Sequence, residues 1–575
     1  MKIVCLVKQV PRADAIEFDE ETKQLRREGV PLLLNPFDAF AVAHAAELRD
    51  KNGGEVIALT MGPPQAGEAL RTCLALGADR CIHLSDRVFA VADTLGTSRT
   101  LSMAIEKEGG VDLVLCGRKT TDSETWQVPP ETAAFLGWPH LTNVVEAELD
   151  GRRIRATRGG DHGYDTYELD APAVVSLAYA RDASDTRDGR IDVWSGADLV
   201  DDLREDDPRF GQPGSPTRVL AVRDVTPERS GDVFAAVDEA AERMRSLLAE
   251  RRLRPPSWDK PEHIAEKPGK RYDCWTFVET ADARPRRASL ELLGRGRELA
   301  GKLGGENVAL VLSTDAEAIA REAARHGAER VVVVEDERLE TYHPEVWSHA
   351  LRRVVEQARP HVLLIPATPL GRDVGPRLAG ELQLGMTGDC VGVDIARAGR
   401  LLQTKPAYGG NIVSVIMGRT TPQLATVRPR MYEPLEPRDV EPVIERIDIG
   451  ALPEPRARLV ERREAQAWDL DETDVIVLIG PEAPAGFRPD GPAIAGTREV
   501  CEQGLLPRNR QVGLYGRPVA PRLLVTVGVP GDFEHITGFV KAGVIVSING
   551  GEEMDARADV VMRGNPAELV PRLLQ

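Results

Sequence analysis

Short apolar runs alternate with longer amphipathic stretches along most of the chain. This alternation predicts parallel strands joined by helices, which is the pattern of α/β proteins. Up to residue 431, the runs that we expect to form strands are Ile3–Val7, Val56–Leu59, Cys81–Leu84, Val111–Cys116, Val174–Leu177, Trp275–Val278, Val308–Leu312, Val331–Val334, His361–Ile365 and Leu424–Val427.

The chain repeats this pattern internally. Gly77–Arg80 reads G-A-D-R ahead of one expected strand, and Gly327–Arg330 reads G-A-E-R ahead of another, 250 residues later. Val111–Gly117 corresponds to His361–Ala367 at the same spacing. We therefore expect two copies of one α/β domain, facing each other across a pseudo-twofold axis.

Changes in composition predict where these units begin and end, because Pro-rich and charged stretches interrupt the apolar pattern. We expect a first half at residues 1–200, a connecting arm at 201–270 with one helix near Val233–Arg251, a second half at 271–431, a Pro-, Glu- and Arg-rich linker at 432–470, and a third unit at 471–575.

Glycine clusters lie next to the expected strands of the third unit. Open parallel sheets bind ligands at the carboxyl ends of their strands, and backbone N–H groups beside Gly528 and Gly531 could cradle a pyrophosphate. Glycine clusters at such positions are more often only tight turns, so the pattern alone leaves both interpretations open. The expected strands are Val475–Ile479, Leu523–Val527 and Val544–Ile548, and the clusters are Gln511–Arg517, Val527–His535 and Ser547–Gly551.

The amino-acid composition and net charge limit the kinds of function that we expect of the protein. The 575 residues include 73 Lys and Arg against 91 Asp and Glu, a formal net charge of −18, which disfavours nucleic acid and anionic membranes as partners. No apolar run approaches the ~20 residues that cross a bilayer, so we expect no direct membrane insertion. Residues 1–10 lack a signal-peptide pattern, so we expect a cytoplasmic protein.

The distribution of cysteine and histidine argues against metal chemistry. The seven cysteines are widely spread and contain no C-x-x-C pair, so no disulfide framework, zinc site or iron–sulfur site is expected. The ten histidines occur singly. No set of residues predicts a catalytic centre.

Several ordered motifs carry a family resemblance. Thr497-Arg498, Q-V-G-L-Y-G-R at Gln511–Arg517 and V-G-V-P-G-D-F-E-H at Val527–His535, with I-N and A-D after them, resemble the FAD-binding domain of the electron-transfer flavoprotein alpha subunit. Residues 366–390 and 406–429 resemble the rest of that subunit, and residues 1–252 resemble the beta subunit. The chain is thus identified as a beta–alpha fusion. The implied fold is α/β, with two pseudo-symmetric parallel-sheet domains plus a C-terminal doubly wound FAD-binding domain.

The resemblance implies a set of FAD-binding residues. Arg498, Tyr515 and His535 correspond to positions that tune the flavin, because a fixed positive charge or a donor there favours the reduced ring. Other positions would hold the ring edge, pyrophosphate, ribose or adenine: Thr497, Gln511, Val512, Gly513, Gly516, Gly528, Gly531, Glu534, Asn549 and Asp559.

The chain also departs from the family pattern near these positions. Tyr515 stands where a Thr is usual, Pro530 replaces a Ser and removes a backbone N–H, and Glu534 replaces a Gln. A carboxylate at Glu534 would lower the flavin potential. The segment Gly480–Gly496 is shorter than in the family. FAD binding is still expected, but the redox tuning does not carry over.

A second nucleotide site is implied in the first half, where the family holds AMP or, in its electron-bifurcating branch, a second FAD. We weigh AMP, a second FAD and no nucleotide as alternatives. Trp126 replaces a small residue and could stack on a base or fill the pocket. The residues at the nucleotide-holding positions are Asn35, Asp38, Gly117, Asp122, Thr125, Trp126, Gln127 and Val128.

The expected function is electron carriage through FAD, from a dehydrogenase donor to a membrane quinone oxidoreductase or another acceptor. One alternative is a bifurcating flavoprotein that oxidises NADH, and another is a nucleotide-binding protein of this fold that has lost flavin. The fusion makes a pseudo-heterodimer within one chain. The family's dehydrogenase-docking loop corresponds to Ala180–Trp194, which is shortened here and has no lysine, so the usual docking is in doubt.

Overall fold

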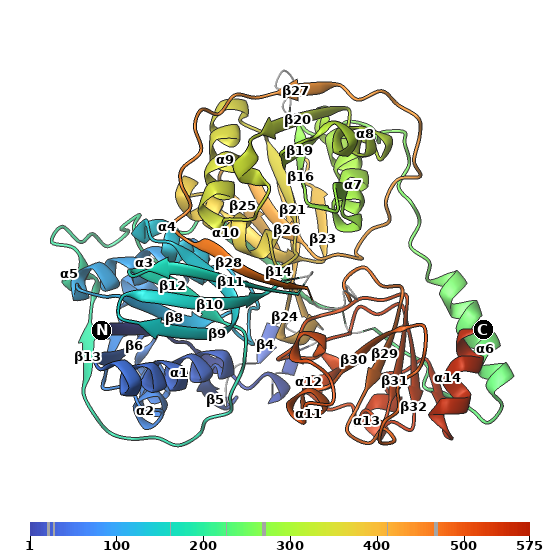
Figure 1. Ribbon diagram of the computed structural model, residues 1–575, viewed down its shortest axis with the longest axis horizontal. Coiled ribbons are helices and arrows are strands. Elements are labelled where there is room, and N and C mark those ends of the chain that lie inside the picture. Colours follow the sequence, from blue (N-terminus) through green and yellow to red (C-terminus); the bar gives the residue numbers. More distant parts are fainter. Residues whose placement is uncertain are drawn as a thin grey trace.

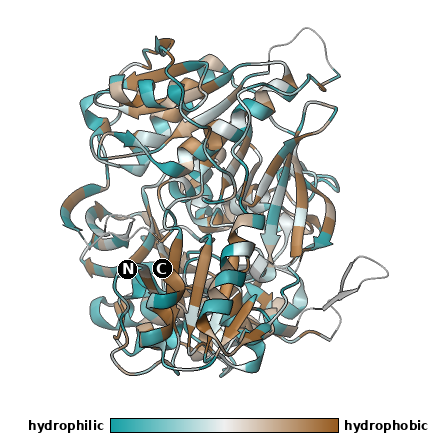
Figure 2. Cartoon of the chain, turned by 90° about the vertical axis from the view of Figure 1, so that its right-hand side faces the viewer, coloured by the Kyte–Doolittle hydropathy of each residue, from teal (hydrophilic) through white to brown (hydrophobic). Residues whose placement is uncertain are grey.

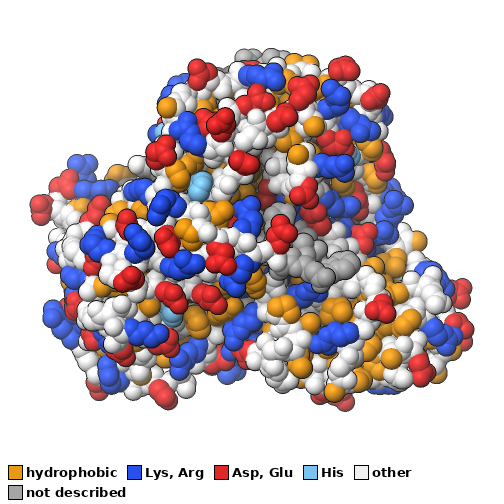
Figure 3. All heavy atoms as spheres, viewed as in Figure 1, with side chains coloured by type: hydrophobic (Ala, Val, Ile, Leu, Met, Phe, Trp, Pro, Cys, Tyr) orange, Lys and Arg blue, Asp and Glu red, His pale blue; other side chains and the backbone are white. Residues whose placement is uncertain are grey.

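The computed structural model contains three units, each built on its own main sheet (Figure 1). It describes the chain except residues 16, 20–23, 27–28, 161–162, 226, 267–271, 411 and 465–469. Parts of the expected connecting arm and linker therefore lie outside the described residues. Hydrophobic residues gather on the strands and the inner faces of the helices (Figure 2), whereas acidic and basic side chains are interspersed over the face in Figure 3.

The first half contains a mixed ten-stranded sheet in the order β13-β7-β6-β1-β8-β12-β9-β10-β11-β28. Its strands from β13 to β9 are parallel, and those from β9 to β28 are antiparallel. The strands are β1 (Lys2–Leu6), β6 (Glu55–Met61), β7 (Arg80–Leu84), β8 (Leu113–Gly117), β9 (His140–Asp150), β10 (Arg153–Gly159), β11 (Gly163–Asp170), β12 (Ala173–Leu177) and β13 (Ile191–Trp194). The helices are α1 (Pro36–Asn52), α2 (Gly67–Ala75), α3 (Thr94–Glu108), α4 (Val128–Leu136) and α5 (Gly196–Leu199). Two short pairs complete it, β2 (Gln9–Pro11) with β5 (Leu32–Leu34) and β3 (Glu17–Asp19) with β4 (Gln24–Arg26).

The second half repeats this arrangement with a parallel sheet in the order β22-β26-β21-β16-β19-β20-β27, and a separate antiparallel sheet in the order β14-β25-β24-β23. Its strands are β16 (Cys274–Val278), β19 (Asn307–Ser313), β20 (Arg330–Glu335), β21 (Val362–Pro366), β22 (Met386–Cys390), β23 (Gly392–Ile395), β24 (Leu401–Ala407), β25 (Ile412–Gly418) and β26 (Gln423–Val427), with the short pair β17 (Thr280–Ala281) and β18 (Arg284–Pro285). Its helices are α7 (Arg287–Leu303), α8 (Glu317–Arg325), α9 (Pro344–Ala358) and α10 (Gly371–Leu382).

The two halves exchange strands. β14 (Thr217–Asp224), from the connecting arm, pairs with β25 of the second half. In return, β28 (Arg458–Glu464), from the linker, pairs with β11 of the first half. β13 and β27 (Ile444–Arg446) occupy matching edges beside β7 and β20. The connecting arm therefore adds a strand to the second half, and the linker adds a strand to the first half. This reciprocal arrangement agrees with the expected pseudo-twofold relation between the halves.

The third unit is a parallel six-stranded sheet in the order β15-β33-β32-β31-β29-β30. Its edge strand β15 (Asp232–Phe234) and the helix α6 (Val237–Glu250) come from the connecting arm, and α6 packs beside the last helix (Figure 1). The remaining elements are β29 (Val475–Ile479), β30 (Ala493–Gly496), β31 (Leu523–Val527), β32 (Val544–Ile548), β33 (Val560–Met562), α11 (Arg498–Glu502), α12 (Phe533–Ile536), α13 (Glu552–Asp555) and α14 (Pro566–Leu574).

Helices α4 and α10 cross closely where the two halves meet. A Cβ atom on Gly380 would lie 2.7 Å from the Cβ of Ala134, so only glycine permits this approach. In the described part of the chain, no helix is long and apolar enough to cross a membrane, and no group of His, Cys, Asp and Glu could hold a metal ion.

Candidate functional site

The carboxyl ends of the third unit's strands lie along one edge of its sheet. In doubly wound folds, ligands bind at this edge. Thr497 and α11 follow β30, Gly528 follows β31, and Asn549 follows β32. The structure therefore brings most of the predicted FAD-binding residues to one edge.

Gly528 and Gly531 hold positive φ angles of 60° and 96°, which favour glycine. A Cβ on Gly528 would lie 2.3 Å from the nitrogen of Ala483, and one on Gly531 would lie 2.2 Å from the nitrogen of Met554. Neighbouring protein backbone thus approaches both glycines. In this structure they serve contacts within the chain, rather than leaving a cradle that a side chain would fill.

Arg498, Tyr515 and Glu534 form a polar cluster at this edge. The guanidinium of Arg498 lies 4.7 Å from the centre of the Tyr515 ring and 4.0 Å from a carboxylate oxygen of Glu534. It also forms ion pairs with Glu502 at 2.9 Å and with Asp182 of the first half at 3.1 Å. Burial raises the pKa of the Tyr515 hydroxyl and of Glu534.

His535 lies buried beside this cluster. Its Nε2 is 3.3 Å from the carboxylate of Glu499, and the hydrogen bond between them holds the pKa of Glu499 down at about 2. Its Nδ1 is buried and has no hydrogen-bond partner among the described residues. A buried ring nitrogen of this kind is suited to contact a ligand.

The segment from Gln511 to Gly516 folds tightly at the same edge. A Cβ on Gly513 would lie 2.7 Å from the carbonyl oxygen of Glu534, and one on Gly516 would lie 2.3 Å from that of Gln511. Val512 is buried against Gly538, within 3.0 Å of where a Cβ there would lie. These contacts hold the Tyr515 turn against α12.

Asn549 and Asp559 lie at opposite edges of the third sheet. The Asn549 amide donates to the carbonyl of Gly564 at 2.8 Å, at the carboxyl edge. Asp559 precedes β33 at the amino edge, where its fully buried carboxylate accepts from Arg229, from Arg251 at 2.8 Å and from the Ile545 amide at 2.9 Å. Asp559 therefore ties the connecting arm to the sheet and does not join the other predicted FAD-binding residues.

The first half places its predicted nucleotide residues at the carboxyl ends of β1 and β8. Asp38 is buried and accepts from the amides of Lys8 at 2.9 Å and Gly117 at 3.0 Å, and burial raises its pKa to about 7. A Cβ on Gly117 would lie 2.5 Å from the Cβ of Phe37, so glycine is required there. The Asn35 Oδ1 atom is fully buried without a hydrogen-bond partner among the described residues.

The loop from Gly117 to Val128 continues this site. Asp122 forms an ion pair with Lys8 at 2.6 Å. Gln127 donates to Glu131 and to the Met386 carbonyl, so its amide joins the two halves and is already used. Thr125 lies against the second half near Gly388, and Val128 begins α4.

Trp126 sits among cations. The guanidinium groups of Arg118 and Arg372 lie 4.9 and 4.8 Å from its ring centre, and the Lys119 ammonium lies at 5.7 Å. Cation–π contact accounts for this grouping. Trp126 and Glu124 also have positive φ angles of 63° and 47°, which are strained for residues with side chains.

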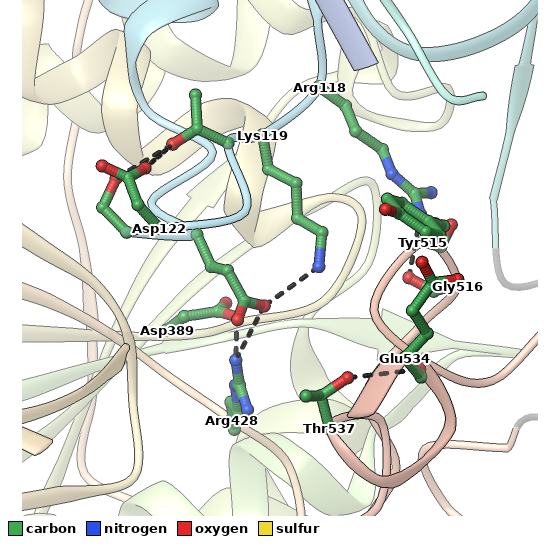
Figure 4. Close-up of polar contacts among 12 residues, drawn as sticks. Arg118, Lys119, Asp122, Asp389, Arg428, Tyr515, Gly516, Glu534 and Thr537 are labelled. Atoms are coloured by element: carbon green, nitrogen blue, oxygen red, sulfur yellow. Dashed lines mark hydrogen bonds and ion pairs between the residues drawn. The ribbon is translucent and has the colours of Figure 1, made fainter. Parts of the chain in front are cut away.

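Sequence reasoning missed a buried charge cluster behind this loop. Lys119 pairs with Glu124 at 2.9 Å, and Asp389 accepts from Arg372 at 2.7 Å. Asp389 also accepts from Arg428 at 3.0 Å (Figure 4). Lys405 donates to the Glu124 carbonyl at 2.9 Å, and burial lowers its pKa to about 8. A single sequence does not show that a loop residue has a positive φ angle, or that a charged side chain pairs with the other half. Charged side chains in polar loops are normally exposed, so the sequence did not predict this cluster.

A pocket that is partly open to solvent lies between the loop 117–128 and the turn at Tyr515. Arg118 extends from that loop and donates to the carbonyls of Tyr515 at 3.0 Å and Gly516 at 2.8 Å (Figure 4). The two predicted nucleotide sites therefore adjoin. The His535 Nδ1 atom, which lies 3.8 Å from the Asp532 carboxylate without a hydrogen bond, the Arg498 cation and the Tyr515 hydroxyl fit the polar edge of a flavin ring. The turn at Gly528 and Gly531 is occupied by protein.

Comparison with protein families gives two matches. The sequence model described as "Electron transfer flavoprotein domain" matches residues 22–197 and 274–452. The model described as "Electron transfer flavoprotein FAD-binding domain" matches residues 491–540. The first match falls on both halves, in agreement with the internal repeat, and the second falls on the polar cluster of the third unit.

Curated relatives match the chain in two consecutive pieces. The electron transfer flavoprotein subunit beta of Thermoanaerobacterium thermosaccharolyticum is 39% identical over 259 residues, 43% of this chain and 98% of the relative. The electron transfer flavoprotein subunit alpha of Clostridium acetobutylicum is 32% identical over 319 residues, 52% of this chain and 95% of the relative. The caffeyl-CoA reductase-Etf complex subunit CarD of Acetobacterium woodii is 36% identical over 263 residues, 44% of this chain and 100% of the relative.

Proposed function

The chain belongs to the electron transfer flavoprotein family as a fused beta–alpha pair, and from this premise we propose that it carries electrons through FAD held by the third unit. Electrons would come from a dehydrogenase and pass to a quinone oxidoreductase or another acceptor. The observation that carries the proposal is the cluster of Arg498, Tyr515 and His535 at the binding edge, inside the segment that matches the FAD-binding model.

Each member of this cluster has a role that its chemistry supports. Bound FAD supplies the one- and two-electron chemistry. Arg498 would hold a fixed positive charge beside the ring, partly offset by Glu502, Asp182 and Glu534. Tyr515 stays protonated because burial raises its pKa, so its hydroxyl remains a donor. The other predicted FAD contacts, except Gly528, Gly531 and Asp559, belong to the proposed site.

We further propose that the first half holds a second phosphate-bearing nucleotide, either AMP or a second FAD. The buried and unpartnered Asn35 Oδ1 atom and the strained loop around Glu124 and Trp126 support a ligand there. The cations around Trp126 would favour a phosphate more than a base stacked on its ring.

The bifurcating alternative has one specific observation in its favour. Arg118 joins the loop of the second site to the Tyr515–Gly516 turn, so two flavins bound at these sites would be neighbours. The alternative that the protein binds a nucleotide but no flavin is supported by Pro530 and by the protein backbone that approaches Gly528 and Gly531.

Anaerobic spectroscopy on the FAD-loaded chain tests these proposals. A carrier reduced with dithionite should be reoxidised by a soluble quinone analogue, and NADH alone should leave its flavin spectrum unchanged. Bleaching by NADH would support the bifurcating alternative. A reduced flavin that no quinone or dye reoxidises would contradict electron carriage.

A further inference from the structure

A second, smaller pocket lies between the second half and the third unit. Among the described residues that line it, Asp471 is the one carboxylate, and none has an aromatic ring. Figure 4 shows two of the lining residues at neighbouring positions, Arg428 of the second half and Thr537 of the third unit. Cations of both units meet in this pocket. They are Arg372, Arg428, Arg430 and Lys541.

The carboxylates behind this pocket are shared among several cations. Asp389 accepts from Arg372 at 2.7 Å and from Arg428 at 3.0 Å, so one carboxylate serves two guanidinium groups of the lining. Glu124 lies 3.8 Å from Arg428, but its carboxylate already pairs with Lys119 at 2.9 Å. A buried charge without a counterion is destabilising. Positive charge is therefore in excess on the side of the pocket that the second half forms.

Lys541 brings a further positive charge from the third unit. Its side chain is partly buried, and no carboxylate in the described part of the chain lies at ion-pair distance from it. Asp471, the carboxylate of the lining, lies 3.9 Å from Arg517. Burial and the neighbouring charge of Arg428 lower the pKa of the Lys541 ammonium. An anion in the pocket would offset this repulsion between the two units.

Arg430 supplies a buried donor that the protein leaves unused. Its side chain is largely buried, with one guanidinium nitrogen paired to Asp474 at 2.6 Å and another donating to the carbonyl of Glu472. Its Nε atom is buried without a hydrogen-bond partner among the described residues. Leaving a buried donor unpaired is costly, so natural proteins usually satisfy such a group with a ligand, water or ion. The unused donor therefore points to an acceptor at this pocket.

We propose that this pocket binds a small inorganic oxyanion, such as phosphate or sulfate, between Lys541 of the third unit and Arg428 and Arg430 of the second half. Guanidinium and ammonium groups make strong charged hydrogen bonds to oxyanions, and the lining offers no ring on which a base or flavin could stack. Because both units contribute cations to one anion, binding strengthens the contact between them. The site goes beyond the proposed function, since it requires neither FAD nor a redox partner.

Calorimetric titration of the purified full-length chain with phosphate, and separately with sulfate, tests the site at constant ionic strength. One series contains excess AMP, which blocks the proposed nucleotide site of the first half, and phosphate binding should persist there. Lys541→Gln should weaken phosphate binding by roughly 10- to 100-fold, the effect of losing a charged hydrogen bond. Lys541→Arg keeps the charge and should retain binding. Arg572→Gln removes an exposed charge of the same unit, paired with Asp238 at 2.8 Å, and should leave binding unchanged.

Arg430→Gln provides a second test from the other side of the pocket. It should weaken phosphate binding in the same range as Lys541→Gln, because it removes the unused donor and a positive charge. Arg430 also pairs with Asp474, so thermal unfolding without anion establishes that the variant is folded.

Hydrogen exchange locates the bound anion. Phosphate should slow amide exchange in residues 428–431 of the second half and in residues 537–541 of the third unit, and Lys541→Gln should abolish both effects. Protection of only one of these segments would contradict an anion that bridges the two units.

The anions and the AMP series decide between the remaining outcomes. Binding of phosphate and sulfate alike supports an oxyanion site, and binding of phosphate alone supports the site and identifies its ligand. Absence of binding, binding that AMP abolishes, or binding that Lys541→Gln leaves unchanged would overturn the proposal. A chain that carries no FAD would contradict the proposed function without affecting this titration.

Discussion

Single charged side chains set the environment of the proposed flavin. Arg498 faces carboxylates of Glu502, Asp182 and Glu534, so its positive charge reaches the ring already partly offset. Burial raises the pKa of Glu534 and favours its protonation, which would lessen its negative charge as the pH falls. The flavin potential should therefore depend on the charge state of Glu534.

Replacing Glu534 by Gln should raise the flavin potential, because it removes a negative charge beside Arg498. We expect a shift of about 30 mV, equivalent to ~1.4 kcal/mol for a two-electron couple. Spectroelectrochemical titration of the FAD-loaded chain measures this shift. Glu553→Gln, an exposed change in α13 of the same unit, serves as control, and an equal shift in both variants would contradict the local effect.

Asp38 should make the folded first half less stable as pH rises. Its folded pKa of about 7 lies above the ordinary value of 3.8, so the folded state holds its proton more tightly than the unfolded state. The stability contribution is greatest below pH 4 and is lost progressively towards pH 7. The stability advantage of the wild type over Asp38→Asn should shrink by about 1–4 kcal/mol over that range.

Denaturant unfolding of the two proteins between pH 4 and 8 measures this difference. A gap between wild type and Asp38→Asn that stays constant with pH would mean that Asp38 does not titrate near neutrality.

Some site residues could be placed from the sequence and others could not. Gly528, His535 and Asn549 could be placed at one edge because they follow the expected strands β31 and β32. Arg498 follows β30, which was not predicted, and Tyr515 follows no strand but lies in a turn packed against α12. Asp559 matched a motif in sequence but lies at the opposite edge, because it precedes its strand rather than following it. Arg118 and Lys119 have the pattern of exposed loop charges, but Arg118 donates to carbonyls 397 and 398 residues away, and Lys119 pairs with Glu124 in the interior.

At the scale of elements, the connecting segments complete the sheets of the units that they join. β14 and β28 cross between the halves, and β15 with α6 completes the third unit. The apolar runs predicted the buried central strands well, since both faces of such strands are covered. β28 is a polar edge strand with no such run, and β14 is an edge strand whose apolar residues 219–222 are largely exposed. The partners of both strands lie far away in sequence.

The helix α6 should be part of the stability of the third unit. Leu247 is buried in a cluster with Val525 and Val546 of the third sheet. Leu247→Ala should therefore destabilise the third unit by ~2–5 kcal/mol, the range for emptying a buried leucine site. Hydrogen exchange of the β31 and β32 amides measures the effect locally.

Leu253, just after α6 and 45% exposed, provides the matched control, since truncating an exposed leucine should cost little. If Leu247→Ala left exchange in β31 and β32 unchanged, α6 would not be part of this core.

At the scale of the whole molecule, one buried carboxylate joins the two halves. Asp373 of the second half is fully buried, and it accepts from His140 at 2.9 Å, Thr142 at 2.6 Å and Arg158 at 3.0 Å of the first half, and from Tyr342 at 2.7 Å. Asp373→Asn should cost ~3–5 kcal/mol, because Arg158 is left as a buried charge without its counterion. Denaturant unfolding followed by Trp fluorescence measures the loss.

Asp165→Asn is the comparison, because Asp165 of the first half also pairs with a residue from a distant segment, Arg462 of the linker strand β28, at 2.8 Å, but at the surface. An exposed pair contributes about 0–1 kcal/mol. Equal losses in the two variants would show that burial does not set the strength of the contact between the halves.

The central claim is that this fused chain holds FAD in its third unit, and quantifying the cofactors released from the purified protein tests it most directly. Acid extraction followed by chromatography should yield one FAD per chain, together with one AMP if the protein is a simple carrier. Two FAD per chain would instead favour the bifurcating alternative. A chain that releases no FAD, and takes up none when FAD is added, would contradict the account.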